Sequence, residues 1–276
     1  MKRPSMLIAA IAAIAIAAIA MVGSAQAADG GSLGIGVDYS SGKYGTDITT
    51  EILSVPVTAR FDSGNWSLRA SLPWVRVSGD PNVLPTVGLI DNLNPIGRGR
   101  TGIIRAPTAG DPAQAEQGTT SGVGDLTLAA TYSVPTGTQL GLDLGVNAKI
   151  ATADENKSLG TGANDYGVTI DLYRDFDGTM LFGGVGHTWL GSSTYIVVGS
   201  VNSGNIGISQ AAGRGRVGMM YEHRTATTSG LDDRRDLVAF YNVPTTGNGR
   251  FQVYASGGQS DGSPDWGAGI SISTGF

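Results

Sequence analysis

Histidines and charged residues are the side chains with which this chain of 276 residues could do chemistry. It has no cysteine and only two histidines, His187 and His223. A histidine beside a serine and an aspartate could serve a hydrolase or a protease. The chain contains neither a G-x-S-x-G elbow nor an H-E-x-x-H zinc motif. We therefore predict no catalytic residue, no cofactor and no metal site, and interpret both histidines as interfacial residues.

Charged residues recur at every second position of segments whose other positions are apolar. A period of two is what a β-strand produces, because successive side chains point to opposite faces. We predict that these charges line one interior, where opposed basic and acidic walls would orient dipolar solutes. The alternative is that the charges pair with each other and fill that interior. The predicted pore-lining residues are Arg60, Arg69, Asp125, Asp143, Lys149, Asp165, Asp171, Arg214, Arg216, Glu222, Arg224, Asp236 and Arg250.

Strands are the elements that must position these charges. The alternation is clearest at 138–150, where Leu142 and Leu144 flank Asp143, and it extends over about twelve segments. The predicted strands are 32–40, 47–61, 65–78, 123–134, 138–150, 164–174, 179–190, 201–211, 214–225, 233–243, 249–260 and 265–276. The glycine-rich stretch 207–218 lacks a following helix, so we interpret it as a tight hairpin and not as a phosphate loop.

The connections between these strands alternate between short turns and longer loops. Short turns on one rim and long loops on the other are typical of an outer-membrane barrel, and strands of about eleven tilted residues cross one hydrocarbon layer. The fold class is therefore predicted to be all-β, a transmembrane antiparallel up-and-down β-barrel of about twelve strands. Its apolar parity would face lipid. In a soluble sandwich, the alternative, that parity would be buried between two sheets.

The first 27 residues carry the features of a secretory signal peptide. Lys2 and Arg3 precede an apolar run at 6–22, and Ala25-Gln26-Ala27 forms an A-x-A cleavage pattern. The alternative is a retained membrane anchor. We expect residues 28–276 to form a single barrel in the outer membrane of a Gram-negative cell. With 18 basic and 23 acidic residues, the chain is not expected to bind nucleic acid.

The longest irregular stretch is the loop at 79–122. Loops of this length are usually functional or disordered, and its apolar residues favour a position in or over the mouth of the barrel, where it would set selectivity. Arg98, Arg100 and Arg105 are the candidate anion contacts, and their alternative partners are lipopolysaccharide phosphates or solvent. A barrel of twelve strands lies between filled and open lumens, and the recurrent inward glycines favour a narrow water-filled path.

Three stretches resemble an outer-membrane β-barrel family, the meta-pathway phenol degradation proteins, whose members are often labelled "transporter". They are GVGDLTLAATYSV at 122–134, LGTGANDYGVTIDLYRDFDG at 159–178 and GGQSDGSPDWGAGISISTGF at 257–276. The resemblance implies passage of small, often aromatic or apolar molecules across the outer membrane. Phe276 is similar to the terminal aromatic that the barrel assembly machinery reads in such proteins. The 79–122 loop does not match the family.

The function we expect is a channel for passive or facilitated diffusion of small molecules. The partners implied are outer-membrane lipid and lipopolysaccharide, a small-molecule solute and the barrel assembly machinery, and the oligomeric state stays open. One alternative is an outer-membrane enzyme that uses His187 or His223 on lipid or peptide at the outer rim. Another is a structural barrel that does not conduct.

Overall fold

The computed structural model describes residues 30–85, 87–90, 118–245 and 249–276. The expected signal peptide at 1–27 and the loop residues Arg98, Arg100 and Arg105 lie outside these ranges. Among the described residues, no helix is both long and apolar enough to cross a bilayer.

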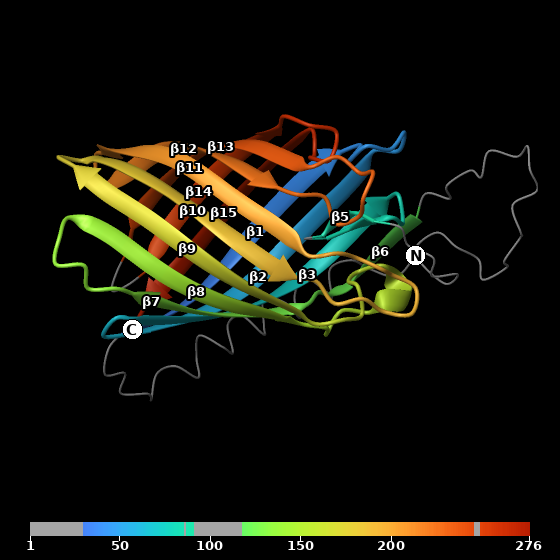
Figure 1. Ribbon diagram of the computed structural model, residues 1–276, viewed down its shortest axis with the longest axis horizontal. Helices are drawn as coiled ribbons and strands as arrows, with labels where there is room; N and C mark the ends of the chain where they lie inside the picture. Colours follow the sequence, from blue (N-terminus) through green and yellow to red (C-terminus); the bar gives the residue numbers. More distant parts are fainter. Residues whose placement is uncertain (1–29, 86, 91–117, 246–248) are drawn as a thin grey trace, which may run out of the picture.

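The described chain forms a closed antiparallel barrel of twelve strands (Figure 1). Consecutive strands pair all the way round, and the first strand pairs with the last to close the wall. The strands are β1 (Gly31–Gly42), β2 (Thr50–Ser63), β3 (Trp66–Gly79), β6 (Gly118–Val123), β7 (Leu126–Ser133), β8 (Leu140–Ile150), β9 (Asp165–Phe176), β10 (Thr179–Trp189), β11 (Val201–Ala212), β12 (Gly215–Arg224), β13 (Arg234–Pro244), β14 (Arg250–Gly258) and β15 (Trp266–Gly275). β6 and β7 both pair with β3 and together count as one wall strand.

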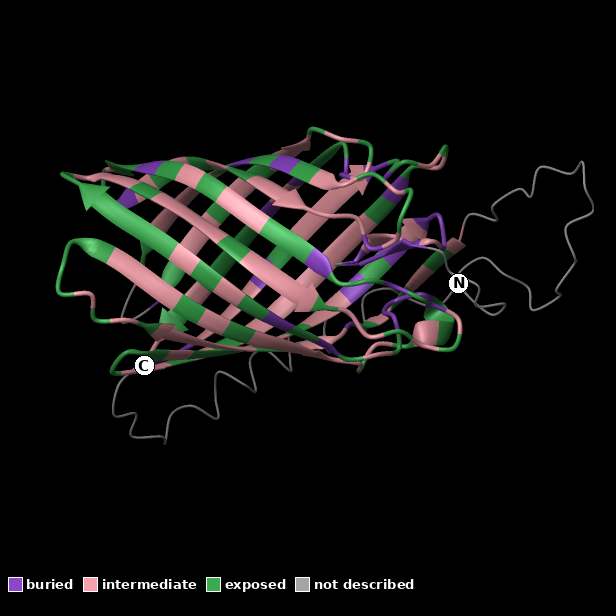
Figure 2. Cartoon of the chain, in the orientation of Figure 1, coloured by how far each residue is buried: buried purple, intermediate pink, exposed green. Residues whose placement is uncertain are grey.

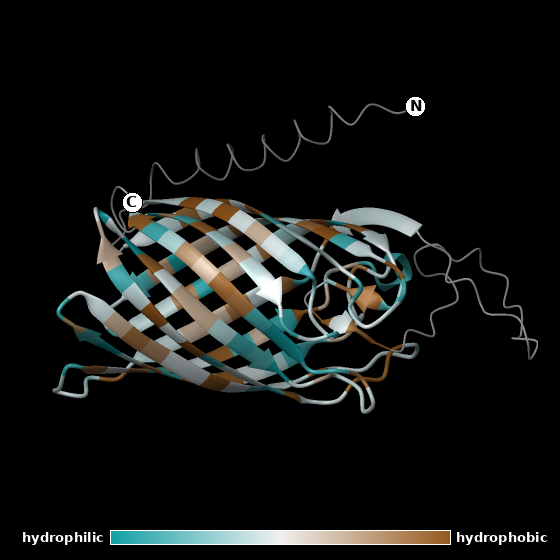
Figure 3. Ribbon diagram, turned by 90° about the horizontal axis from the view of Figure 1, so that it is seen from above, coloured by the Kyte–Doolittle hydropathy of each residue, from teal (hydrophilic) through white to brown (hydrophobic). Residues whose placement is uncertain are grey.

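Large apolar side chains cover the outside of the barrel, as the prediction that the apolar parity faces lipid requires. Leu144, Val146, Ile170 and Ile206 are all exposed, and bands of apolar residues alternate with polar residues along the strands (Figure 3). Lipid offers no hydrogen-bond partners, so only a closed sheet satisfies every backbone group there. The exposed apolar parity is therefore the lipid-facing surface, and the prediction of a transmembrane barrel is confirmed.

The two rims differ as the sequence predicted. Three tight turns use residues with positive φ, at Gly64, at Asp177 and Gly178, and at Gly213. The turn at Gly213 confirms the predicted hairpin within 207–218. Phe276 exchanges backbone hydrogen bonds of 2.9 and 3.2 Å with Gly31, so both ends of the wall lie at the turn rim. In barrels of this type the turn rim faces the periplasm and the loop rim faces outwards.

The predicted strand 123–134 differs from the structure. It begins five residues earlier, at Gly118, and it is interrupted between β6 and β7 at Gly124 and Asp125. The partner residue there is Pro73, which has no N–H to donate to the ladder. Gly124 N–H donates to the Pro73 carbonyl over 2.8 Å, and the register with β3 shifts by one residue between β6 and β7. The last residues of the predicted 79–122 loop are thus part of the barrel wall.

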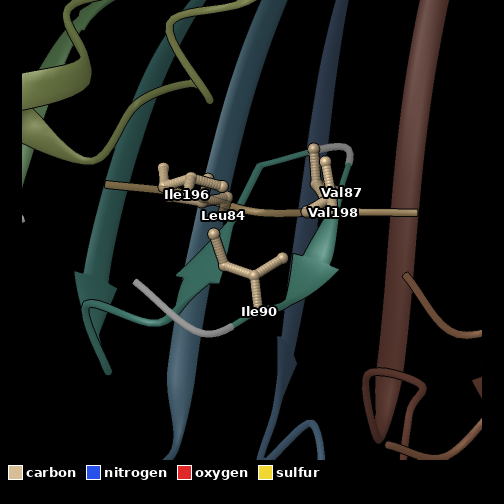
Figure 4. Close-up of a cluster of buried hydrophobic side chains, with 5 residues drawn as sticks. All are labelled: Leu84, Val87, Ile90, Ile196 and Val198. Carbon is tan, nitrogen blue, oxygen red and sulfur yellow. The ribbon is translucent and has the colours of Figure 1, made fainter. Parts of the chain in front are cut away.

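Buried residues gather at the loop rim (Figure 2). One apolar cluster joins the small hairpin of β4 (Val83–Leu84) and β5 (Gly88–Leu89) to the loop at 190–200. Its buried members are Leu84, Val87, Ile90, Ile196 and Val198 (Figure 4). A second cluster, Val75, Val77 and Leu159, packs the loop at 151–164 against the inner face of β3. Among the described residues, the packed apolar core therefore lies mainly near the outer mouth.

Candidate functional site

The interior of the barrel holds adjoining cavities that extend from the loop rim towards the turn rim. The turn-side cavity has a volume of about 720 Å³, the loop-side cavity about 440 Å³, and a side cavity against β10 and β11 about 310 Å³. The turn-side and loop-side cavities share Asp38, Gln252 and Tyr254. The loop-side and side cavities share Glu222, Arg234 and Asp236.

Asp38 and Tyr254 form the boundary between the two larger cavities. The Tyr254 hydroxyl donates a hydrogen bond of 2.8 Å to Asp38 Oδ1. Both residues are in register with Gly269 of β15, the strand that separates β1 from β14. A Cβ at Gly269 would lie 2.4 Å from Asp38 Oδ1 and from Tyr254 Cε1. The absence of a side chain at Gly269 lets this pair cross β15 flat against the wall.

At other inward glycines, too, a neighbouring side chain occupies the space that a Cβ would need. A Cβ at Gly141 would meet the Tyr173 ring, one at Gly145 would meet the Thr169 hydroxyl, and one at Gly167 would meet Asn147. We expected such glycines to leave open space. In the structure, a side chain of an adjacent strand occupies the space over each of these glycines. The glycines therefore keep larger inward side chains close to the wall.

The turn-side cavity is lined by five arginines. These are Arg60, Arg69, Arg214, Arg216 and Arg250, and the aspartates in the same lining are Asp38 and Asp62. All five arginines belong to the predicted pore-lining set. The structure brings them together from β2, β3, β12, β14 and the turn before β12. This part of the lumen is a basic wall.

Two predicted acidic residues lie on the other side of the barrel. Asp143 and Asp171 are cross-strand neighbours on β8 and β9. In the order of the twelve wall strands, β8 stands opposite β14, and β9 stands opposite β15. Asp171 lines the side cavity, while the arginines of the turn-side cavity come from strands on both sides of β15 and β1. A transverse field between the acidic pair and the arginines stays a prediction.

Three other predicted pore-lining residues pair with each other near the loop rim. Lys149 Nζ lies 3.2 Å from Asp125 and 3.0 Å from Asp165, and the three side chains are only 8–11% exposed. Lys149 also donates to Thr161 Oγ1 over 2.9 Å. Asp125 Oδ1 accepts from the N–H groups of residues 152 and 153. This Lys149 cluster matches the alternative of paired charges that fill the barrel.

Glu222, Arg224 and Asp236 line the side cavity together with Asp171 and Arg234. Arg234 forms an ion pair with Asp236, and it is a lumen residue that the sequence reasoning missed. Asp38 and Tyr254 were also missed, although each lies on the polar parity of its strand. Apolar residues of the lumen stand on the polar parity without a charge, so the alternation of charged and apolar positions does not identify them. Met220, Val238 and Phe240 line the loop-side cavity.

The two histidines lie at the outer ends of their strands and contact neighbouring side chains. His187 Nδ1 is 2.7 Å from Asn202 Oδ1, and its ring contacts Trp189 with centroids 4.7 Å apart. His223 Nε2 is 3.0 Å from Asp233. Within the described ranges, no group of three or more His, Cys, Asp or Glu residues could hold a metal ion.

The hairpin of β4 and β5 closes part of the outer mouth. Leu84, Pro85 and Gly88 line the loop-side cavity from above. The Thr227 hydroxyl donates to the Leu89 carbonyl over 3.2 Å, and Asp80 N–H donates to Thr50 Oγ1 over 2.9 Å. These bonds and the apolar cluster of Figure 4 hold the hairpin inside the barrel entrance.

Comparison with known proteins supports the fold class. Neither a family model nor a curated protein matches the chain. An outer membrane channel from Pseudomonas putida F1 superposes with a TM-score of 0.63 at 13% identity, covering 91% of this chain and 97% of its own. The β domain of a Bordetella autotransporter gives 0.50 at 11% identity, covering 90% and 100%. The toluene transporter of Ralstonia pickettii gives 0.43 at 11% identity, covering 88% of both chains. The chain is an outer-membrane β-barrel.

Proposed function

We propose that this barrel is an outer-membrane channel for the passive or facilitated diffusion of small molecules. The observation that carries the proposal is the series of adjoining cavities inside the wall, lined by charges and by a few aromatic and aliphatic side chains. The similarity to an outer membrane channel of Pseudomonas putida F1 supports it. No covalent step is required, because a lumen acts on a solute through its width, hydrogen bonds and charge.

The solutes we propose are small molecules with an aromatic or apolar part, as the resemblance to the phenol degradation family implies. The loop-side cavity supports this class, since Met220, Val238 and Phe240 provide apolar surface beside Tyr254. Phe182 adds a second ring 6.3 Å from that of Phe240. The same cavity contains Asp38, Glu222, Arg234 and Asp236, so a solute with an apolar part meets apolar surface beside charged groups.

The pore-lining charges and the hairpin have separate roles in this proposal. The charges of the basic wall and of Asp143 and Asp171 orient a solute in the wide part of the lumen. The hairpin at 83–90 narrows the mouth, and Arg98, Arg100 and Arg105 of the same loop are proposed as selectivity residues. Phe276, exposed at the turn rim, is proposed as the signal for the assembly machinery after removal of residues 1–27.

Purified protein in planar bilayers tests the channel, together with the swelling of liposomes in a panel of aromatic acids, sugars and apolar compounds. We expect discrete conductance steps and the fastest swelling for small aromatic solutes. Absence of both steps and swelling would contradict the proposal.

A non-conducting structural barrel is the second candidate, because the buried hairpin and the Lys149 cluster both fill the outer part of the lumen. The two candidates predict different conductance once the hairpin no longer fills the mouth. A closed channel conducts after the hairpin has been loosened, whereas a barrel packed throughout does not. The same bilayer assay on a Leu84→Asp variant therefore separates them.

A further inference from the structure

The turn-side cavity carries an excess of positive charge, whereas the linings of the loop-side and side cavities carry an excess of negative charge. Five arginines and two aspartates line the turn-side cavity. Arg60 and Arg69 are directly opposite each other on β2 and β3. The charged neighbours of Arg69 are Arg60, Arg250 and Asp62, so two like charges face it against one opposite charge. Like charges placed opposite each other on paired strands are destabilising. The fold therefore holds Arg60 and Arg69 opposite each other at a cost in stability.

Two of the five arginines have partners that account for their charge. Arg60 binds Asp62 with Nε 2.9 Å from both carboxylate oxygens. Arg216 lies 3.1 Å from Asp175 and also donates to Ser209 and to the carbonyl of Gly178. The second aspartate of the lining, Asp38, accepts from Tyr254.

The other three arginines keep their charge available to the lumen. Within the described residues, Arg69, Arg214 and Arg250 form no ion pair with a carboxylate. All three are exposed, and all three line the same cavity. Guanidinium groups are planar forks that bind a carboxylate through two parallel hydrogen bonds.

We propose that the turn-side cavity is a binding subsite for a small organic carboxylate with an apolar body. The three available arginines would hold the carboxylate group. Pro56, Pro244 and the ring of Tyr254 provide apolar surface in the same lining, which suits an apolar body and not a bare inorganic ion. A volume of about 720 Å³ accommodates a single-ring acid with water around it.

The subsite deepens the proposed function and rests on it, because the solute reaches the cavity through the lumen. The arginines of the turn-side cavity would also favour movement of a carboxylate towards the periplasmic rim. A carboxylate that passes Asp38 at the boundary moves from acidic to basic surroundings and is retained near the periplasmic rim. Weak retention of this kind raises the local concentration of a solute without closing the path.

Binding is measured without any need for conduction, by equilibrium dialysis of labelled benzoate against the full-length barrel in detergent at low ionic strength. Benzyl alcohol and inorganic phosphate are the comparison ligands. The test variant is Arg69→Gln with Arg250→Gln, which leaves both paired arginines in place. The control is Arg76→Gln on the same strand as Arg69, because Arg76 shares the outward parity of Leu68 and Leu72.

We expect benzoate to bind, benzyl alcohol to bind at least about tenfold more weakly, and the double variant to lose about tenfold or more in affinity. The Arg76→Gln barrel should bind like the parent. Equal benzoate affinity in parent and double variant would overturn the proposal, and so would phosphate binding as tight as that of benzoate. Binding by a barrel that never conducts would instead overturn the proposed channel and leave the subsite standing.

Discussion

The Tyr254 hydroxyl donates a 2.8 Å hydrogen bond to the carboxylate of Asp38, a residue 216 positions away in sequence. The two side chains meet across β15 at the one position of their row that has no side chain, Gly269. They form the boundary between the turn-side and loop-side cavities. A single backbone position thus determines how far a tyrosine ring projects into the lumen.

The first prediction concerns Gly269→Ala. The added Cβ would lie 2.4 Å from atoms of both Asp38 and Tyr254, so the tyrosine ring has to move towards the lumen and the hydrogen bond is lost. We expect a lower single-channel conductance and a loss of about 1–3 kcal/mol in the free energy of unfolding. Conductance in bilayers and urea unfolding followed by tryptophan fluorescence measure the two effects.

Gly257→Ala is the matched control for that variant. Gly257 lies on β14 near Tyr254, and a Cβ there would meet no atom within 4 Å. Its conductance and unfolding midpoint should equal those of the parent. A Gly269→Ala barrel that also behaves like the parent would show that the row of Asp38, Gly269 and Tyr254 does not limit the lumen.

The second prediction concerns the Lys149 cluster. Asp125→Asn removes one of the two carboxylates that face Lys149 and weakens the acceptor for the backbone of residues 152 and 153. Removing one partner of a buried ion pair lowers the free energy of unfolding by about 3–5 kcal/mol, because the other charge remains uncompensated. The loss is smaller here, because Asp165 still faces Lys149. We expect a loss of about 1–3 kcal/mol and faster proteolysis within the loop at 151–164.

Asp154→Asn is the surface comparison, because its pair with Lys157 is 43–54% exposed. Exposed ion pairs contribute about 0–1 kcal/mol, so its proteolysis rate and unfolding midpoint should hardly change. Equal effects of the two substitutions would mean that the Lys149 cluster stabilises the barrel no more than an exposed ion pair does.

Contacts at the loop rim, those of the Lys149 cluster among them, involve residues of all three stretches that carry the family resemblance. Asp125 ends the segment GVGD at 122–125 of the first stretch, and Thr161 and Asp165 belong to TGANDYG at 161–167 of the second. In the third stretch, Ser263 exchanges hydrogen bonds of 2.7 and 2.8 Å with the backbone of Arg235. All three stretches therefore tie outer loops to the ends of strands. These contacts determine how the outer loops are held at the barrel rim, and they do not by themselves identify a solute.

The sequence predicted the strands and the inward face of charges such as Arg60 and Arg250 because alternation with a period of two is a local property. It could not predict which inward residues meet. The contact of Asp38 with Tyr254, or of Lys149 with Asp125, depends on the register between strands and on the closure of the whole wall. The sequence indicated that the apolar residues at 83–90 lie in or over the mouth, but it could not predict their hairpin or the residues that bury them. These apolar residues do not alternate, and their burial comes from Ile196 and Val198 in a distant loop.

The third prediction concerns pH and the loop at 225–233. The pKa of Asp233 lies below its usual value, first because Ala226 N–H donates to the carboxylate over 2.9 Å and then because His223 contacts it. A carboxyl group with a lowered folded-state pKa stabilises the fold above its unfolded pKa of about 3.9, and this contribution disappears as the pH falls through the folded value.

Comparison of the parent barrel with Asp233→Asn across pH measures this contribution. We expect the parent to have the higher unfolding temperature above about pH 5 and the difference to shrink as the pH falls below about 3.9, vanishing only below the lowered folded-state pKa of Asp233. Asp232→Asn, one residue earlier in the same loop, controls for the loss of one negative charge from this loop. A parent–variant difference that stays constant over the whole pH range would contradict the assignment.

The fourth prediction concerns Leu84, the buried centre of the hairpin cluster. Leu84→Asp would place a charge among Val87, Ile196 and Val198, and an unpaired buried charge is costly enough to move the segment into water. Because the hairpin lines the loop-side cavity from above, we expect its release to increase single-channel conductance at least about twofold while the wall stays folded. Val197→Asp is the control, since Val197 lies between two cluster members but is 71% exposed. Unchanged conductance of the Leu84→Asp barrel, with the hairpin shown to be protease-sensitive, would mean that the narrowest part of the lumen lies deeper, at Asp38 and Tyr254.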